Sequence, residues 1–178
     1  LPSTSVTGGS AYLNFVSGSG VGSSYGVQVG GYTGNFAGDS FGDFSIYCVD
    51  FLHYATSGNV VVSQMSGGLG DTRLGGYSGW TASQARTTYQ KAAYLASLFD
   101  TSAQSAWGDI HGAIWALTSG QSLGDPVARQ AYIDMADQNY ASVDLGDWYV
   151  ISPTRIADGY GQGRGTGTYD GRGQEILM

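Results

Sequence analysis

Cys48 is the only cysteine among the 178 residues, and its surroundings could support thiol chemistry. It lies in an apolar run over 46–51, which predicts a buried strand. Because side chains alternate along a strand, Cys48 and Asp50 are expected on one face and His53 on the other. One cysteine cannot form an intramolecular disulfide, so Cys48 is expected to be a buried thiol, an intermolecular link or a reactive group.

His111 is the second residue that could take part in such chemistry. It lies between Trp107 and Trp115 on the apolar stripe of a predicted helix. If this helix packs against the strand, Cys48, Asp50 and His111 converge in one site walled by aromatic rings. A thiolate–imidazolium pair would make the sulfur nucleophilic. The alternative is an inert buried thiol beside a core histidine.

The elements that must position these residues can be predicted from periodicity. Short apolar segments bounded by Gly and Ser predict strands over 11–16, 25–29, 44–54, 59–65, 148–152 and 174–178. A loop over 66–79 precedes a change to helical spacing. Capping boxes at 81–84 and 101–104 predict two helices, and Asp125 followed by Pro126 predicts a third through about Tyr140. The segment 159–173 holds seven glycines and predicts a flexible loop or linker.

The order of strands, helices and strands indicates an α+β fold, a β barrel or sandwich with a helical insertion of about three helices. The length suits one domain over 1–178. Its strands are expected over about 5–65, its helices over about 81–142 and its closing strands over about 146–178.

Composition narrows the class of partner. Charged residues are only 12% of the chain, the net charge is −7, and Lys91 is the single lysine. This balance excludes nucleic acid and an anionic membrane surface as partners, since both require clustered Lys and Arg. No apolar run reaches the length of a membrane-spanning helix. Thirty glycines and thirteen tyrosines are typical of an exported β-rich protein, and Leu1 is expected to be a mature or trimmed start.

Two short segments carry a family resemblance. Tyr47-Cys48-Val49-Asp50 and the helical segment 110–115 resemble the paired motifs of bacterial thioester domains. In that family the strand cysteine and a helix glutamine join into an internal thioester, and His111 occupies the glutamine position here. The resemblance implies a barrel plus helices over about residues 5–178. The ending 173–177 is similar to the stretch that precedes the sorting anchor of exported PEP-CTERM-type proteins in Gram-negative bacteria.

Imidazole has no acyl carbon, so His111 cannot replace the glutamine of the family. Three interpretations remain open. Cys48 and His111 are core residues of a structural or adhesive descendant, or they form the thiolate–imidazolium pair. The third is a thioester that uses another donor: Gln104, Asp50 or Gln64.

Other sites are less well supported by the sequence. No close spacing of metal ligands exists, so no metal and no cofactor is expected. An isopeptide bond would join Lys91, the only lysine, to an Asn or Asp, with Glu175, the only glutamate, as the catalysing acid. A sugar site would use aromatic rings among glycines, namely Tyr25, Tyr32, Phe36, Trp80 and Tyr77.

The sequence thus predicts a non-enzymatic exported surface protein with a role in adhesion or in an extracellular matrix. Its partner would be a surface or matrix component, either a protein amine or a polysaccharide. The alternatives are a covalent adhesin or Cys–His thiol site at Cys48, and a carbohydrate-binding module.

Overall fold

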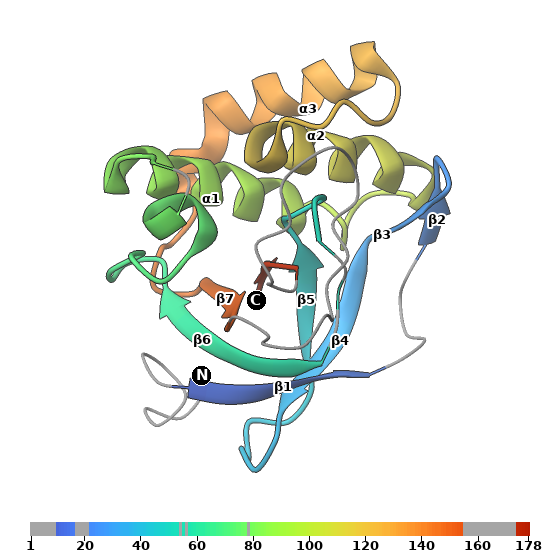
Figure 1. Cartoon of the computed structure of the whole chain (residues 1–178). Helices are drawn as coiled ribbons and strands as arrows, with labels where there is room; N and C mark the ends of the chain where they lie inside the picture. The colour runs from blue at the N-terminus through green and yellow to red at the C-terminus, as the bar shows by residue number, and fades with distance from the viewer. Residues whose placement is uncertain (1–9, 17–21, 54, 56, 78, 155–173) are drawn as a thin grey trace.

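The computed structural model describes residues 10–16, 22–53, 55, 57–77, 79–154 and 174–178. Within these ranges, antiparallel strands close a barrel in the order β1-β4-β5-β8-β7-β6 (Figure 1). Their bounds are β1 Ser10–Val16, β4 Gly31–Phe36, β5 Phe44–Cys48, β6 Gly58–Gln64, β7 Tyr149–Pro153 and β8 Ile176–Leu177. β2 (Gly22–Ser24) and β3 (Val27–Val29) form a separate two-stranded sheet. The predicted α+β class is confirmed. Of the two architectures predicted, barrel and sandwich, the structure has the barrel.

The helices lie together over one end of the barrel (Figure 1). They are α1 (Ala82–Ser97), α2 (Trp107–Ser119) and α3 (Pro126–Asn139), with short turns η1 (Arg73–Tyr77), η2 (Gln104–Ala106) and η3 (Tyr140–Ser142). No helix in the described part of the chain has both the length and the apolar character needed to cross a membrane.

Capping explains where α1 and α3 begin. Thr81 and Gln84 form both halves of the predicted capping box of α1. The Asp125 carboxylate accepts hydrogen bonds from the first turn of α3, and Pro126 occupies its first position. The box predicted at 101–104 is wrong, because the Thr101 hydroxyl donates back to the carbonyl of Leu98. α2 instead continues from the η2 turn without a side-chain cap.

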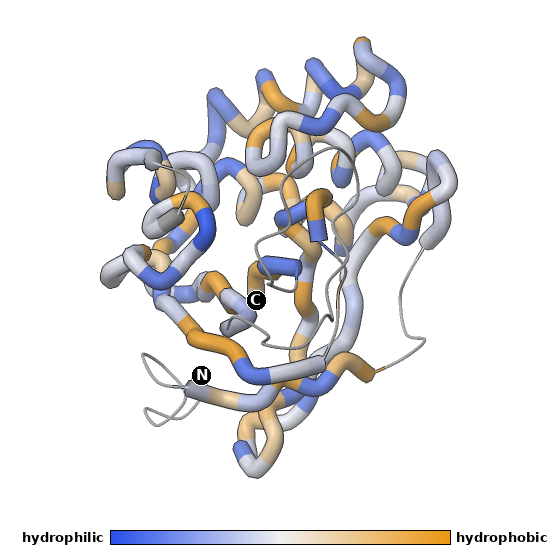
Figure 2. The backbone as a smooth tube through the Cα atoms, in the orientation of Figure 1, coloured by the Kyte–Doolittle hydropathy of each residue, from blue (hydrophilic) through white to orange (hydrophobic). Residues whose placement is uncertain are grey.

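Apolar side chains form two clusters. One fills the barrel and includes Leu13, Ile46, Cys48 and Ile151. The other lies between the barrel and the helices, and includes Tyr89, Ile110, Ile114 and Trp115. Figure 2 shows hydrophobic residues along the barrel strands and on the helices above them. Each fully buried aliphatic side chain contributes about 1.5–3 kcal/mol to stability, so these clusters fix the helices on the barrel.

Strand β4 was absent from the predicted elements because two glycines dilute its apolar character. A Cβ on Gly31 would lie 3.0 Å from the ring of Tyr47, and one on Gly34 would lie 3.0 Å from Ile46. These glycines therefore let neighbouring side chains pack close to the backbone of the barrel wall. Such a role gives no periodic signal in the sequence.

Two predicted strands have different bounds. The segment 25–29 begins with a turn at Tyr25 and Gly26, where both residues have positive φ, and only 27–29 is strand. Strand β5 ends at Cys48 rather than continuing to Tyr54. Residue 54 itself and the glycine-rich segment 159–173 lie outside the described residues.

Candidate functional site

Cys48 lies at the end of β5, beside a cavity of about 370 Å³. Its side chain is 2% exposed and also contacts the apolar cluster inside the barrel. We call this space the Cys48 cavity. Besides Cys48, its lining includes the aromatic rings of Tyr32, Phe51 and Trp115 and the polar side chains of Ser23, Gln28, His53 and Gln174.

His53 lies on the same cavity as Cys48 and contacts Asp50. The Nδ1 of His53 is hydrogen-bonded to Oδ2 of Asp50, while Oδ1 of Asp50 accepts a 2.9 Å hydrogen bond from the backbone N–H of Leu52. Both side chains are buried, with 1% of Asp50 and 7% of His53 exposed. The expectation that His53 points away from Asp50 is therefore wrong. The strand ends at Cys48 and the chain turns over 51–53, so strand alternation no longer applies.

His111 joins helix α2 to the barrel through backbone groups. The N–H of Gly30 donates to Nδ1 of His111 at 2.9 Å. Because Nδ1 accepts, the ring proton is on Nε2, which donates to the carbonyl oxygen of Cys48 at 2.9 Å. This hydrogen bond brings α2 into contact with the end of β5. Both ring nitrogens are nevertheless engaged by backbone atoms rather than by the Cys48 thiol.

The environment of His111 keeps its ring neutral. The ring stacks on Trp115 with centroids 4.3 Å apart and lies 5.1 Å from the ring of Phe99. Complete burial lowers the pKa of His111 from 6.5 to about 4, although its bond to the Cys48 carbonyl acts in the opposite direction. At neutral pH His111 is an uncharged connector between α2 and the strands.

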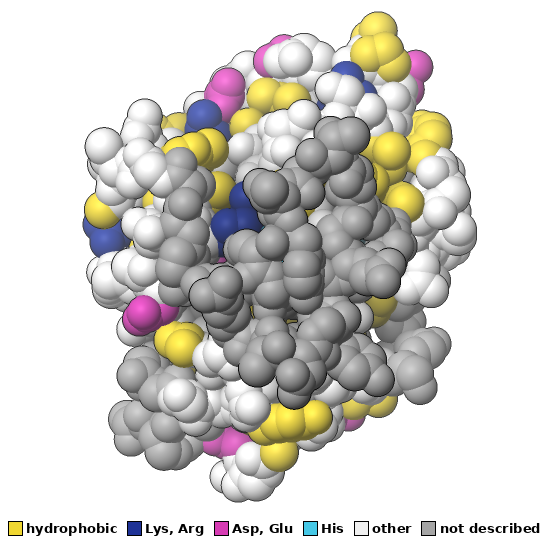
Figure 3. All heavy atoms as spheres, in the orientation of Figure 1, with side chains coloured by type: hydrophobic (Ala, Val, Ile, Leu, Met, Phe, Trp, Pro, Cys, Tyr) yellow, Lys and Arg dark blue, Asp and Glu magenta, His cyan; other side chains and the backbone are white. Residues whose placement is uncertain are grey.

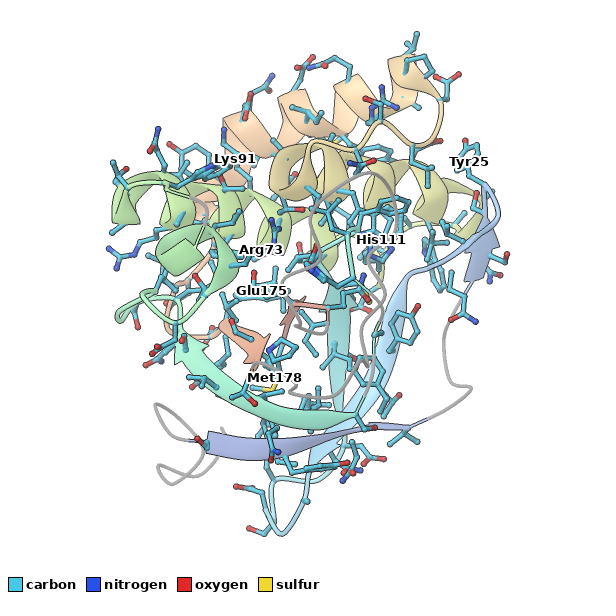
Figure 4. All side chains as sticks on the ribbon, in the orientation of Figure 1. Tyr25, Arg73, Lys91, His111, Glu175 and Met178 are labelled. Atoms are coloured by element: carbon cyan, nitrogen blue, oxygen red, sulfur yellow. The ribbon has the colours of Figure 1, made fainter. Side chains whose placement is uncertain are left out.

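A second buried polar cluster surrounds Glu175, between the helices and the barrel. Oε1 of Glu175 accepts 2.7 Å hydrogen bonds from the backbone N–H of Arg73 and the hydroxyl of Ser152. Oε2 accepts a hydrogen bond from the hydroxyl of Tyr89. Figure 4 shows Arg73 and Glu175 close together below α1. Burial raises the pKa of Glu175, and the charge of Arg73 opposes that shift.

The Tyr89 hydroxyl is the third member of this cluster, and it is also hydrogen-bonded to η1. It accepts a 3.1 Å hydrogen bond from the N–H of Leu74. Burial and the neighbouring Glu175 carboxylate raise the pKa of Tyr89 well above its usual value of 10.0. Tyr89 is therefore a neutral donor to Glu175 at any physiological pH.

Arg73 connects the Glu175 cluster with the Cys48 cavity. Its Nε lies 3.6 Å from Oδ2 of Asp50, and its Nη2 donates to the carbonyl of Thr118 at 2.7 Å. The sequence gives no sign that Arg73 and Glu175 meet, because each is a single charge in an uninformative setting. Arg73 lies in a predicted loop, and Glu175 lies near the chain end.

The remaining candidate residues lie apart from Cys48. The amide of Gln64 donates to the carbonyl of Gly146, and Gln104 packs beside Gly22. The Lys91 ammonium lies 2.6 Å from the carboxylate of Asp137, whose side chain is exposed rather than buried. Glu175, the expected catalysing acid, instead accepts a hydrogen bond from the backbone N–H of Arg73. Among the described side chains, no group of three or more His, Cys, Asp or Glu could hold a metal ion.

The aromatic residues named for a sugar site are divided among several places. Tyr32 lies on the Cys48 cavity, and Phe36 packs inside the barrel. The hydroxyl of Tyr25 donates to the carboxylate of Asp109. Trp80 borders a separate surface groove beside α1, together with residues that include Thr87. The side chain of Tyr77 lies outside the described part of the chain.

Comparison with known proteins adds no further identification. No family model matches this chain, and neither the curated proteins nor the solved structures contain a significant match. The site must therefore be interpreted from its own chemistry. It offers a thiol, an imidazole–carboxylate pair and a cavity with aromatic and neutral polar walls.

Proposed function

We propose that this chain is an exported, non-enzymatic attachment domain that holds a component of an extracellular surface or matrix in the Cys48 cavity. The observation that carries the proposal is the cavity itself. Its volume of about 370 Å³ lies in the range of small-ligand sites. Its walls combine aromatic rings with amide and hydroxyl groups, which suits a neutral saccharide unit of a polysaccharide.

The absence of Lys and Arg from the described lining favours a neutral ligand over a carboxylate or phosphate. The chain as a whole agrees with this choice. Its charged residues are only 12% of the total, and the face in Figure 3 shows few of them among many neutral side chains. A neutral hydroxylated ligand requires no charge complementarity, so such a surface can accept it.

We also propose that the scaffold is of the thioester-domain type. The two motifs that carry this resemblance meet in space, because Nε2 of His111 lies 2.9 Å from the carbonyl oxygen of Cys48. A helix residue at the family's glutamine position therefore lies beside the strand cysteine. In this chain that residue is a backbone-bonded imidazole, which supports attachment without the family's cross-link at this position.

The attachment proposal can be tested by calorimetric titration with neutral oligosaccharides of hexose and pentose units. Tyr32→Ala should weaken binding about tenfold or more, since it removes an aromatic wall of the cavity. The matched control is Trp80→Ala, which removes an aromatic side chain at the separate groove and should leave the affinity unchanged. The proposal fails if no oligosaccharide binds, or if Trp80→Ala abolishes binding and Tyr32→Ala does not.

A covalent adhesin is the second candidate, and Gln174 is the observation that favours it. Its carboxamide lines the same cavity as Cys48, while the residue two positions on, Ile176, pairs with Cys48 across β5 and β8. A Cys48–Gln174 thioester would form with release of ammonia.

Intact mass decides this candidate. The thioester would lower the mass of the chain by one ammonia, and methylamine would open it and restore a free thiol. Gln174→Ala should show the mass calculated from its sequence, with no loss of ammonia. Gln104→Ala, which changes a distant glutamine, should still show the loss. Full mass together with a thiol that titrates readily would rule the thioester out.

A further inference from the structure

Strand β8 closes the barrel with only two residues, Ile176 and Leu177, between β5 and β7 (Figure 1). Ile176 is buried in the cluster inside the barrel, and Leu177 in the cluster between the barrel and the helices. Glu175, one position earlier, is 2% exposed and accepts hydrogen bonds from three donors. A very short segment therefore holds the two neighbouring strands together.

The register of β7 and β8 is that of a hairpin, which needs only a short turn. Ile151 lies opposite Ile176, and the hydroxyl of Ser152 donates a 2.7 Å hydrogen bond to Glu175. Two antiparallel strands in such a register are joined by about two to five residues. In this chain twenty residues, 154–173, separate the two ends, and seven of them are glycines. The connection is thus far longer than the hairpin requires.

A connection of this length allows β8 to reach a second molecule. Twenty residues in a fully extended chain span about 70 Å. A compact domain of 178 residues has a radius of gyration of only about 16 Å. The residues that follow the connection can therefore pair either in their own barrel or in that of a neighbouring copy.

The place of β8 is specific for this segment. Without β8, both β5 and β7 would present an unpaired strand edge, which attracts another strand. The N–H of Val49 donates to the carbonyl of Glu175 at 3.1 Å, and Met178 and Tyr149 exchange two backbone hydrogen bonds of 3.0 Å. Residues 174–178 satisfy these groups, and every copy of the chain carries them.

We propose that two copies of this chain exchange β8, so that each barrel is closed by residues 174–178 of the other copy. The contacts of β8 are the same before and after the exchange, so the concentration of the chain decides between the two arrangements. The strand of the same molecule competes with an effective concentration on the order of 1 mM. Exchanged dimers are therefore expected where the copies are crowded to about this concentration.

Exchange would also bring a residue of one copy to the Cys48 cavity of the other. Gln174 lines this cavity, and its amide donates a hydrogen bond to the carbonyl oxygen of Asp50. It directly precedes the buried part of the exchanged segment and moves with it. The inference does not rest on the proposed attachment function, because it concerns the contacts of β8 and is measured without a ligand.

The test places cysteines at the facing positions Val150 and Leu177 in a Cys48→Ala background. This pair follows the hydrogen-bonded pair of Tyr149 and Met178, so its Cα atoms belong to the closer type of pair, which suits a disulfide. One full-length chain carries Val150→Cys and the other Leu177→Cys, so neither can form this bond within itself.

The two chains are mixed and briefly oxidised with oxidised glutathione. At about 1 mM we expect at least about tenfold more covalent dimer than at about 10 µM. Peptide mass analysis should locate its disulfide between positions 150 and 177. The matched control uses Val127→Cys in place of Val150→Cys, at a residue that is 79% exposed on α3, and should give less than about a tenth of the dimer.

A single chain with both Val150→Cys and Leu177→Cys shows whether the two positions can be joined, since it should form the disulfide within the monomer. The proposal is overturned if this chain forms its disulfide but the mixed chains give no dimer at about 1 mM. Equal dimer yields with Val150→Cys and Val127→Cys would also overturn it.

If the cysteine variants do not fold, native mass spectrometry of the unmodified chain decides instead. Unlabelled and nitrogen-15-labelled chains are mixed at about 1 mM and then diluted to about 10 µM. Mixed dimers that persist after dilution support the exchange, because β8 must leave a barrel before they separate. Monomers alone after dilution refute it.

Discussion

Replacing Glu175 by alanine should lower the free energy of unfolding by about 3–5 kcal/mol, because three donors lose their acceptor and each unsatisfied buried donor costs about 1–3 kcal/mol. Glu175 is 2% exposed and accepts hydrogen bonds from Arg73, Ser152 and Tyr89. The substitution leaves the Ser152 and Tyr89 hydroxyls and the backbone N–H of Arg73 without their acceptor. It also loosens β8, the strand that closes the barrel between β5 and β7.

Urea denaturation followed by circular dichroism measures this change. The matched control is Asp137→Ala, which also removes one carboxylate, in this case from the ion pair with Lys91. The Asp137–Lys91 pair is exposed, with 51% of the Asp137 side chain accessible, so the control should change stability by at most about 1 kcal/mol. Tyr89→Phe, which deletes a single donor to Glu175, should fall between them at about 1–2 kcal/mol. Equal midpoints for Glu175→Ala and Asp137→Ala would contradict the prediction.

Acidification from about pH 6.5 to about pH 4 should weaken the fold through His111 by about 3 kcal/mol. The pKa of this group is lowered to about 4 in the folded state, so only the unfolded chain takes up a proton between these values. The unfolded state therefore gains stability as the pH falls through this window. Below about pH 4 the folded state is protonated too, and the contribution of His111 is lost in full.

Glu175 acts in the opposite direction, so the contribution of His111 must be isolated. The pKa of Glu175 is raised in the folded state, and its contribution to stability is complete below the unfolded value of 4.5 and declines as the pH rises through the folded value. His111→Asn replaces the titrating ring by an amide that can still donate and accept hydrogen bonds. The stability difference between the unmodified chain and His111→Asn should shrink by about 3 kcal/mol from pH 7 to pH 4.

Urea denaturation at several pH values between 4 and 7 provides the measurement. Asp137→Ala again serves as a control. Its stability should change with pH in parallel with that of the unmodified chain, which would show that loss of a surface carboxylate does not alter the pH dependence. Parallel curves for the unmodified chain and His111→Asn would show that burial does not lower the pKa of His111.

Local chemistry made much of the architecture predictable. The capping residues Thr81 and Asp125 mark helix starts wherever they occur, because their side chains bond to N–H groups within a few residues. The spacing of apolar residues likewise predicted five of the barrel strands in part and the face of α2 that carries His111. Such signals are contained in a short stretch of chain, so they can be read before its neighbours in space are known.

The candidate site was less predictable, because its contacts depend on where elements end and on which distant segments meet. Alternation predicted opposite faces for Asp50 and His53, but β5 stops at Cys48 and the following turn brings the two together. The glycines of β4 leave room for side chains of the neighbouring strand β5, and the sequence of β4 alone does not show this.

The hydrogen bonds inside the core also depend on the tertiary structure rather than on the local sequence. Residue types and short spacings predicted the class of fold and the face of α2 that carries His111, because those depend on local periodicity. Which nitrogen of His111 carries the proton depends on the backbone groups that the folded chain places beside the ring. The hydrogen bond from the Arg73 N–H to Glu175 likewise joins residues 102 positions apart, which only the closed barrel brings together. A buried polar group takes whatever partner lies beside it in the folded chain, and the local sequence does not contain that partner.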